Sequence, residues 1–80
     1  MIEHEFGSTI IHVCEDTARC IVYHPTDDNV DTLADYIDKN NYICAMIVGN
    51  SAAVLGLKAQ VGGITTEDKT TISLFERQIC

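Results

Sequence analysis

The chain has 80 residues, which is the length of one compact domain and leaves no room for a second. Its formal charge of −7, from five Lys and Arg against twelve Asp and Glu, argues against binding to nucleic-acid phosphates and favours a basic partner. Hydrophobic residues make up 46% of the chain, which is rich for so small a protein. We therefore expect residues 1–80 to bury one tightly packed core or to cover part of their apolar surface in a homodimer.

Nothing in the sequence predicts secretion or a membrane span. The first five residues are acidic and lack the basic start and apolar stretch of a secretory signal, and no run approaches the ~20 apolar residues of a transmembrane helix. Four cysteines are too few for a disulfide framework, and Cys14, Cys20 and Cys44 lie in apolar runs where a free thiol packs as a small hydrophobe. Cys80, the last residue, is expected to be exposed and able to cross-link on oxidation. We predict a cytoplasmic protein, in the host cytoplasm if it is viral.

The first predicted elements are two strands joined as a hairpin. Residues 8–14 are rich in Thr, Ile and Val, and residues 19–24 form a second apolar run after a short polar break. Because the break is short, the two strands are expected to pair as a hairpin. Pro25 ends the second strand because it has no N–H to donate to a neighbouring strand.

Between Pro25 and Asn41 the spacing predicts one amphipathic helix. Thr26 or Asp27 is expected to cap its beginning, and Asn40 with Asn41 to end it, since Asn tolerates the left-handed conformation found at helix ends. The apolar stripe that would face a sheet consists of Val30, Leu33, Ala34 and Ile37.

Two segments in the second half are harder to assign. Residues 42–48 are almost wholly apolar, which predicts a central strand buried on both faces, and Gly49 with Asn50 predicts a turn after it. Residues 55–61 alternate apolar and polar, which favours a strand hairpinned to the previous one. Their Ala content and the closing Gly62 leave a helix with a glycine stop as the alternative.

Residues 70–76 present the same choice. Their β-branched content favours a strand, whereas Thr65 and Asp68 resemble a capping box and Ile72, Phe75 and Ile79 would share one helical face. With strands at both places the order is ββαβββ. The predicted fold class is α+β, a small single sheet of four to five mainly antiparallel strands with one helix packed on one face.

A row of carboxylates on the predicted helix is the most informative feature of the chain. The row consists of Asp28, Asp31, Asp35 and Asp38. Their i, i+3, i+7, i+10 spacing stacks them along one side of the helix, and the only nearby cation is Lys39 at the helix end. Cβ atoms in such a row lie about 5–6 Å apart, so the row can imitate a phosphate backbone to a basic groove. The alternative is a solvated face that keeps the chain soluble. The predicted partner-binding residues are Asp27, Asp28, Asp31, Asp35, Asp38 and Tyr36.

A second candidate site follows the apolar strand at residues 42–48. The loop there lacks the further glycines and the Lys of a phosphate-binding loop. If the next segment is a helix, however, its beginning near Ser51 could hold an anion, and a pocket at a subunit interface could bind a nucleotide or another anionic metabolite. The residues predicted for this alternative are Gly49, Asn50, Ser51, Lys58 and Arg19.

Histidines and cysteines in the first hairpin were tested as a metal site. If the turn places Cys14 opposite Cys20, these two and His12 and His24 lie on one side of the hairpin and could complete a tetrahedral zinc site. The spacing matches no common zinc module, and a register shifted by one residue splits the set between faces. A nucleophilic Cys14–His12 pair lacks an orienting acid or an oxyanion loop. We therefore predict no metal, no cofactor and no catalytic residue.

The function expected from the sequence is contact with another macromolecule. We predict a small acidic, non-enzymatic binding or inhibitor protein that blocks a basic surface of a protein partner, with no direct nucleic-acid or membrane binding. Its size and charge are common among phage-encoded inhibitors of host defence, an analogy of profile alone. The alternatives are an oligomeric protein that binds and sequesters a small anionic ligand, and a structural assembly component.

Overall fold

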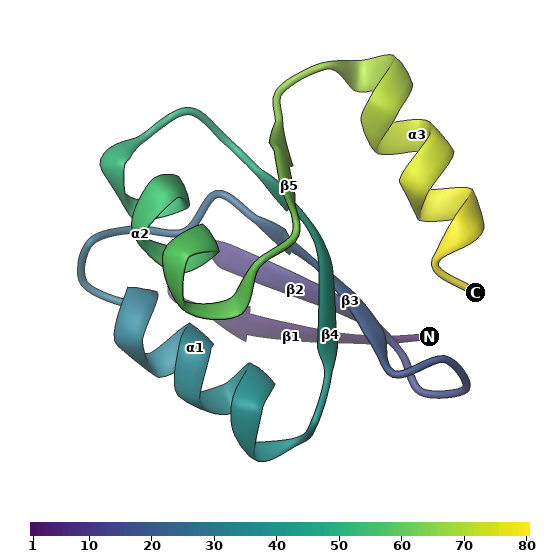
Figure 1. The fold of residues 1–80 in the computed structure, drawn as a ribbon, viewed down its shortest axis with the longest axis horizontal. Helices are drawn as coiled ribbons and strands as arrows, with labels where there is room; N and C mark the ends of the chain where they lie inside the picture. The colour runs from purple at the N-terminus through teal and green to yellow at the C-terminus, as the bar shows by residue number, and fades with distance from the viewer.

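In the computed structural model, which describes residues 1–80, five strands form one mixed sheet and three helices pack on its two faces (Figure 1). The strands are β1 (Ile2–Phe6), β2 (Thr9–Cys14), β3 (Arg19–Tyr23), β4 (Ile43–Val48) and β5 (Ile64–Thr66). The helices are α1 (Val30–Lys39), α2 (Ala52–Val61) and α3 (Lys69–Gln78). The strands lie in sequence order, antiparallel from β1 to β3 and parallel from β3 to β5.

The α+β class and the single sheet are confirmed, as are the strands at residues 8–14, 19–24 and 42–48 and the helix before Asn41. Helix α1 begins later than expected, because its N-cap is Asn29 rather than Thr26 or Asp27. The Asn29 side chain accepts from the Thr26 N–H, so it organises the loop before the helix. The chain leaves the helix through Asn41, whose φ of 58° is left-handed as predicted.

The prediction of a single helix and the order ββαβββ is wrong, because the order is βββαβαβα. The sheet is mixed rather than mainly antiparallel, because two of its four strand pairs are parallel. Residues 52–61 are helical, so β4 pairs with β5 in parallel and forms no hairpin with residues 55–61. The Ser51 hydroxyl accepts a hydrogen bond from the Val54 N–H and caps α2, and Gly62, with φ 78°, ends it. The cap and the glycine stop outweigh the strand-like alternation.

Residues 69–78 are also a helix, so the predicted strand at residues 70–76 is wrong as well. Asp68 is the N-cap, and its carboxylate accepts from both the N–H and the hydroxyl of Thr71. Two side chains of α3, Ile72 and Phe75, and Ile79 just beyond it pack together against the sheet. This is the helical face that the sequence offered as the alternative.

One edge strand was not anticipated. Strand β1 pairs with β2 from Ile2 opposite Val13 to Phe6 opposite Thr9. Its charged residues Glu3 and Glu5 lie on the sheet face opposite to the one that carries Ile2 and Phe6. Charges on an edge strand discourage pairing with another chain.

The two faces of the sheet are covered differently. We call the side covered by the first two helices the α1/α2 face, and the opposite side the α3 face. Eleven buried residues form the core on the α1/α2 face, namely Ile11, Val13, Cys20, Val22, Leu33, Ala34, Ile37, Cys44, Ile47, Val54 and Leu57. Five form the core on the α3 face, namely Cys14, Ile21, Met46, Val48 and Ile79.

The approach of β5 to β4 depends on a glycine. Gly63 has φ 90°, and a Cβ atom placed there would lie 2.7 Å from the carbonyl oxygen of Cys44. Only glycine therefore lets the chain enter β5 at this point. None of the three helices combines the length and the apolar character that a transmembrane span requires.

Candidate functional site

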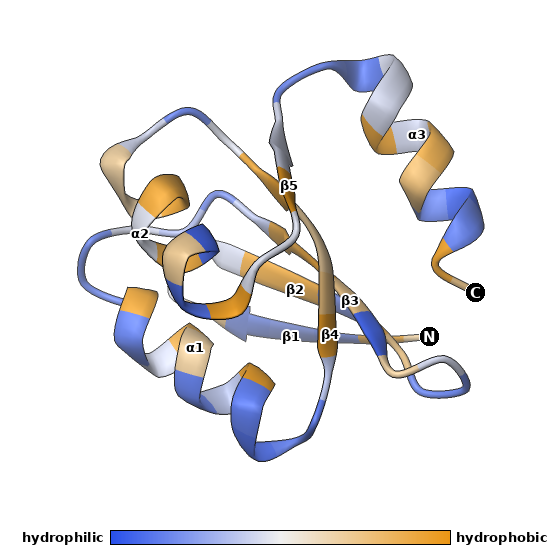
Figure 2. Ribbon diagram, viewed as in Figure 1, coloured by the Kyte–Doolittle hydropathy of each residue, from blue (hydrophilic) through white to orange (hydrophobic).

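The carboxylates of the predicted stripe lie in solvent on and before helix α1. We call Asp28, Asp31, Asp35 and Asp38 the acidic ridge, and all four are exposed, as is Asp27 beside them. The hydropathy colouring in Figure 2 shows hydrophilic stretches along this helix, while its Leu33, Ala34 and Ile37 are buried against the sheet. Burial of the inner stripe fixes the direction in which the ridge points.

No cation of the chain neutralises the ridge. The only contact within 4 Å between a basic and an acidic side chain joins His12 and Glu3 on other elements. The only side-chain hydrogen bond to a ridge residue comes from the Gln60 amide, which donates to Asp31 over 3.3 Å. Like charges at i and i+4, such as Asp31 and Asp35, cost a few tenths of a kcal/mol per pair. The ridge thus carries an electrostatic cost that no Lys or Arg side chain within 4 Å offsets.

The side chain of Tyr36, next to the ridge on α1, is in contact with other aromatic rings. Its ring is half-buried among His4, Phe6 and Tyr42, with ring centroids 5.1, 5.2 and 5.7 Å away. Burial, followed by a hydrogen bond with Tyr42, raises the pKa of Tyr36 to about 12. These contacts account for Tyr36 as a packing residue that joins α1 to β1.

Only part of the second candidate site comes together. Gly49, Asn50 and Ser51 line a hollow of about 480 Å³ at the N-terminus of α2. Lys58 does not line it, and Arg19 lies at the opposite end of the sheet, because it pairs with the first residue of β4 whereas the hollow follows the last. The hollow therefore lacks both of the cations predicted for an anionic ligand.

The strand register divides the histidine and cysteine set. Cys14 lies opposite Arg19 and Cys20 lies opposite Val13, one residue away from the register that a zinc site needs. The two cysteines consequently occupy opposite faces of the sheet. No group of three or more His, Cys, Asp and Glu residues in the chain is placed to hold a metal ion.

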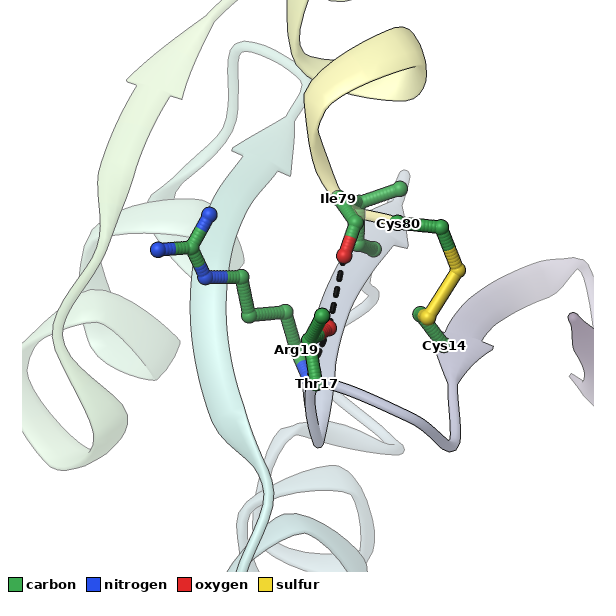
Figure 3. The surroundings of a disulfide bond; sticks show 5 residues. All are labelled: Cys14, Thr17, Arg19, Ile79 and Cys80. Carbon is green, nitrogen blue, oxygen red and sulfur yellow. Dashed lines mark hydrogen bonds between the residues drawn. A yellow bond between two sulfur atoms is a disulfide. The ribbon is translucent and has the colours of Figure 1, made fainter.

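Cys14 forms a disulfide with Cys80, which corrects the expectation that Cys14 is a free thiol packed as a small hydrophobe. Cys80 is exposed, as predicted. The bond joins β2 to the residue after Ile79, 66 positions along the chain (Figure 3). The Thr17 hydroxyl donates to the Ile79 carbonyl over 2.6 Å beside it, and Arg19 extends away from it. Because Cys14 is bonded, it is not a free nucleophile for His12.

The other two cysteines remain thiols in the core. Cys20 and Cys44 are register partners on β3 and β4, and both are buried beneath the helices of the α1/α2 face. A hydrogen bond with Cys44, together with burial, raises the pKa of the Cys20 thiol far above its usual value. Cys20 therefore stays protonated near neutral pH and packs as the small hydrophobe expected from the sequence.

The sequence analysis missed a group of titratable residues on the α3 face. Glu3, His12, Tyr23 and Glu76 lie there, on four different elements. The alternation of polar and apolar residues from Ile2 to Phe6 was the available signal for β1, and with it for the position of Glu3 beside His12.

Comparison with protein-family models, with curated proteins and with solved structures gives no match.

Proposed function

We propose that this chain is a small binding protein that performs no catalysis and uses the acidic ridge to cover a basic surface of a protein partner. The observation that carries the proposal is that Asp27 and the four ridge carboxylates are exposed and none has a Lys or Arg side chain within 4 Å. A surface row without internal counter-ions remains fully available to charges on a partner.

The position of the ridge suits rigid recognition. Helix α1 is fixed by three buried side chains, so the ridge needs little ordering when it binds, and an ordered surface loses less entropy on association. A basic groove that normally receives nucleic-acid phosphates would accept such a row of carboxylates. An inhibitor of the kind that phages direct against host defence is one such protein; if it acts in the reducing host cytoplasm, the Cys14–Cys80 disulfide is open there.

The first test compares two variants of equal net charge. Asp31→Lys with Asp35→Lys reverses the centre of the ridge, and Asp16→Lys with Glu67→Lys reverses two exposed carboxylates elsewhere. With poly-L-lysine as the probe, calorimetry should show that the binding affinity falls by about tenfold or more in the ridge variant and by much less in the control. Raising the salt concentration should weaken the wild-type complex and shrink this difference. Equal losses in the two variants would remove the ridge from the proposal.

A second candidate function rests on the hollow at the start of α2. Residues 52–61 are helical, which was the condition for an anion site there, and Gly49, Asn50 and Ser51 line the hollow. The chain would then assemble into an oligomer whose second subunit supplies the missing cations. Native mass spectrometry and a thermal-shift screen with nucleotides separate the candidates. A dimer stabilised by nucleotides favours this one, an indifferent monomer favours the ridge, and very large assemblies favour a structural component.

A further inference from the structure

A pocket of about 230 Å³ lies on the α3 face of the sheet, away from the acidic ridge. Its lining combines apolar side chains from the sheet and from the end of the chain with two titratable side chains. The lining residues are Met1, His12, Ile21, Glu76 and Ile79. Strand β2 supplies His12, and helix α3 supplies Glu76 from the opposite wall.

Each titratable residue of this lining is held in place by a second side chain. The Glu3 carboxylate lies 2.6 Å from Nε2 of His12. The Tyr23 hydroxyl donates to the Glu76 carboxylate over 2.5 Å, and the rings of His12 and Tyr23 meet edge to face with centroids 4.8 Å apart. Polar groups that are oriented in advance by neighbours are typical of sites that bind ligands.

The charge of this group favours a cation. Glu3 and Glu76 both raise the pKa of Tyr23, after the larger effect of its burial, so both negative charges act at the same place. No Lys or Arg side chain lies within 4 Å of either carboxylate. The α-ammonium group of Met1, itself a lining residue, is the fixed cation at the pocket, and it lies more than 4 Å from both carboxylates, so two negative charges stand against one positive charge. Tyr23 is neutral near pH 7, and its hydroxyl donates to Glu76.

We propose that this pocket binds a small organic ammonium ion. The alkyl part would lie on Met1, Ile21 and Ile79, and the ammonium group would face the carboxylate of Glu76, which lines the pocket. The Glu3 carboxylate adds its charge from behind His12. An apolar floor with a charged, pre-oriented rim selects for a molecule that has both parts. The source of the group is either a free amine or a lysine side chain of a protein, and the two present the same chemistry to the pocket.

The test is a titration followed by two-dimensional ¹H–¹⁵N NMR of the oxidised chain. Butylammonium should shift the amide signals of four lining residues in a saturable way, namely those of His12, Ile21, Glu76 and Ile79. The affinity for 1-butanol should be lower by about tenfold or more, and butyrate should leave these signals unchanged. Nα-acetyl-lysine methylamide, compared with butylammonium, shows which source fits better. Tighter binding of the lysine derivative indicates a protein ligand, and tighter binding of the free amine indicates a metabolite.

Two conservative variants make the result decisive. Glu76→Gln keeps an acceptor for Tyr23 but removes the charge, and should weaken butylammonium binding about tenfold. Glu67→Gln, exposed in the segment before α3, is the matched control and should bind like the wild type. Well-dispersed spectra of both variants show that each is folded. Equal responses to butylammonium and 1-butanol, or undiminished binding in Glu76→Gln, would overturn the proposal. Because the acidic ridge takes no part, this outcome is independent of the test of that ridge.

Discussion

The helices on the two faces of the sheet are held in place by different interactions. On the α1/α2 face, each helix buries three of its own residues, and all of them except Ala53 belong to the core of eleven buried side chains. On the α3 face, the helix itself buries none, and the nearest fully buried side chain is Ile79, just beyond its end. Helix α3 is instead fastened next to that residue by the Cys14–Cys80 disulfide. Packing of side chains secures the first two helices, and a covalent bond secures the third.

This difference follows from how much apolar surface each helix can bury. Burial stabilises by roughly 25 cal/mol per Å², so α3, whose Ile72 and Phe75 are only half-buried against the sheet, gains less from its position than α1 or α2. A cross-link between residues 66 positions apart stabilises mainly by restricting the unfolded chain, by roughly 4 kcal/mol for a loop of this length. The disulfide therefore replaces, on the α3 face, part of what the core supplies on the other.

The largest expected effect is on the packed face. Leu57→Ala removes a side chain that is 0% exposed on α2 and should lower the free energy of unfolding by roughly 3–5 kcal/mol. Leu55→Ala, on the same helix but with Leu55 65% exposed, is the matched control and should change it by less than about 0.5 kcal/mol. Chemical denaturation measures both. Similar losses for the two variants would contradict the assignment of α2 to the core.

Removal of the disulfide should have the next largest effect. Cys80→Ser should lower the free energy of unfolding by roughly 2–4 kcal/mol, because the unfolded chain regains the freedom that the cross-link removes. Reduction of the wild type by dithiothreitol should produce a similar loss, and the Cys80→Ser variant should not respond further to the reductant. A variant as stable as the oxidised wild type would show that α3 is held by its packing alone.

A smaller effect is expected at the loop before α1. The Asn29 amide donates to the Phe6 carbonyl over 3.1 Å and to the Thr9 hydroxyl over 2.8 Å, tying α1 to the hairpin of β1 and β2. Asn29→Ala should cost about 1–2 kcal/mol, since these partners lose their hydrogen bonds in a partly buried place. Asn50→Ala, at an exposed residue, should be nearly neutral in the same denaturation experiment. Equal behaviour of the two variants would contradict this role.

The smallest effect is expected at alkaline pH. The pKa of Tyr36 is raised from 10.0 to about 12, so the folded state holds this proton more tightly than the unfolded chain does. The resulting stabilisation is fully present below pH 10 and is lost as the pH rises through about 12. Absorbance at 295 nm should show an ionisation near pH 12 that is lost in Tyr36→Phe, while the still later ionisation of Tyr23, whose pKa is also raised, remains. An unchanged titration curve in that variant would refute the assignment.

The elements of the α1/α2 face were predicted better from the sequence than those of the α3 face. The apolar stripe of α1 and the apolar runs of β2, β3 and β4 are local patterns, and each is buried in the structure. Helix α2 was harder, because it contacts both α1 and the sheet and carries apolar residues on several sides. Exposed Leu55 together with buried Leu57 imitates the alternation of a strand. The local patterning could not reveal that burial follows Ala53, Val54 and Leu57.

Features that depend on distant parts of the chain could not be predicted. The exposure of Asp31, Asp35 and Asp38 follows from helical spacing and was therefore predictable, whereas Asp28 lies in the turn before α1. The disulfide requires Cys14 and Cys80 to come within 5.7 Å between Cα atoms, which only the complete fold determines. The pocket on the α3 face requires the unexpected strand β1 and helix α3 together. The strand register is another such feature, because a difference of one residue places Cys14 and Cys20 on opposite faces of the sheet.

Hydrogen exchange of individual amides, with and without dithiothreitol, tests most directly whether packing secures one face and the disulfide the other. On reduction, amides of α3 should lose protection while those of β3, β4 and α2 keep theirs, because the core of the α1/α2 face is untouched. Protection in α3 that survives reduction, or a uniform loss throughout the molecule, would contradict this account.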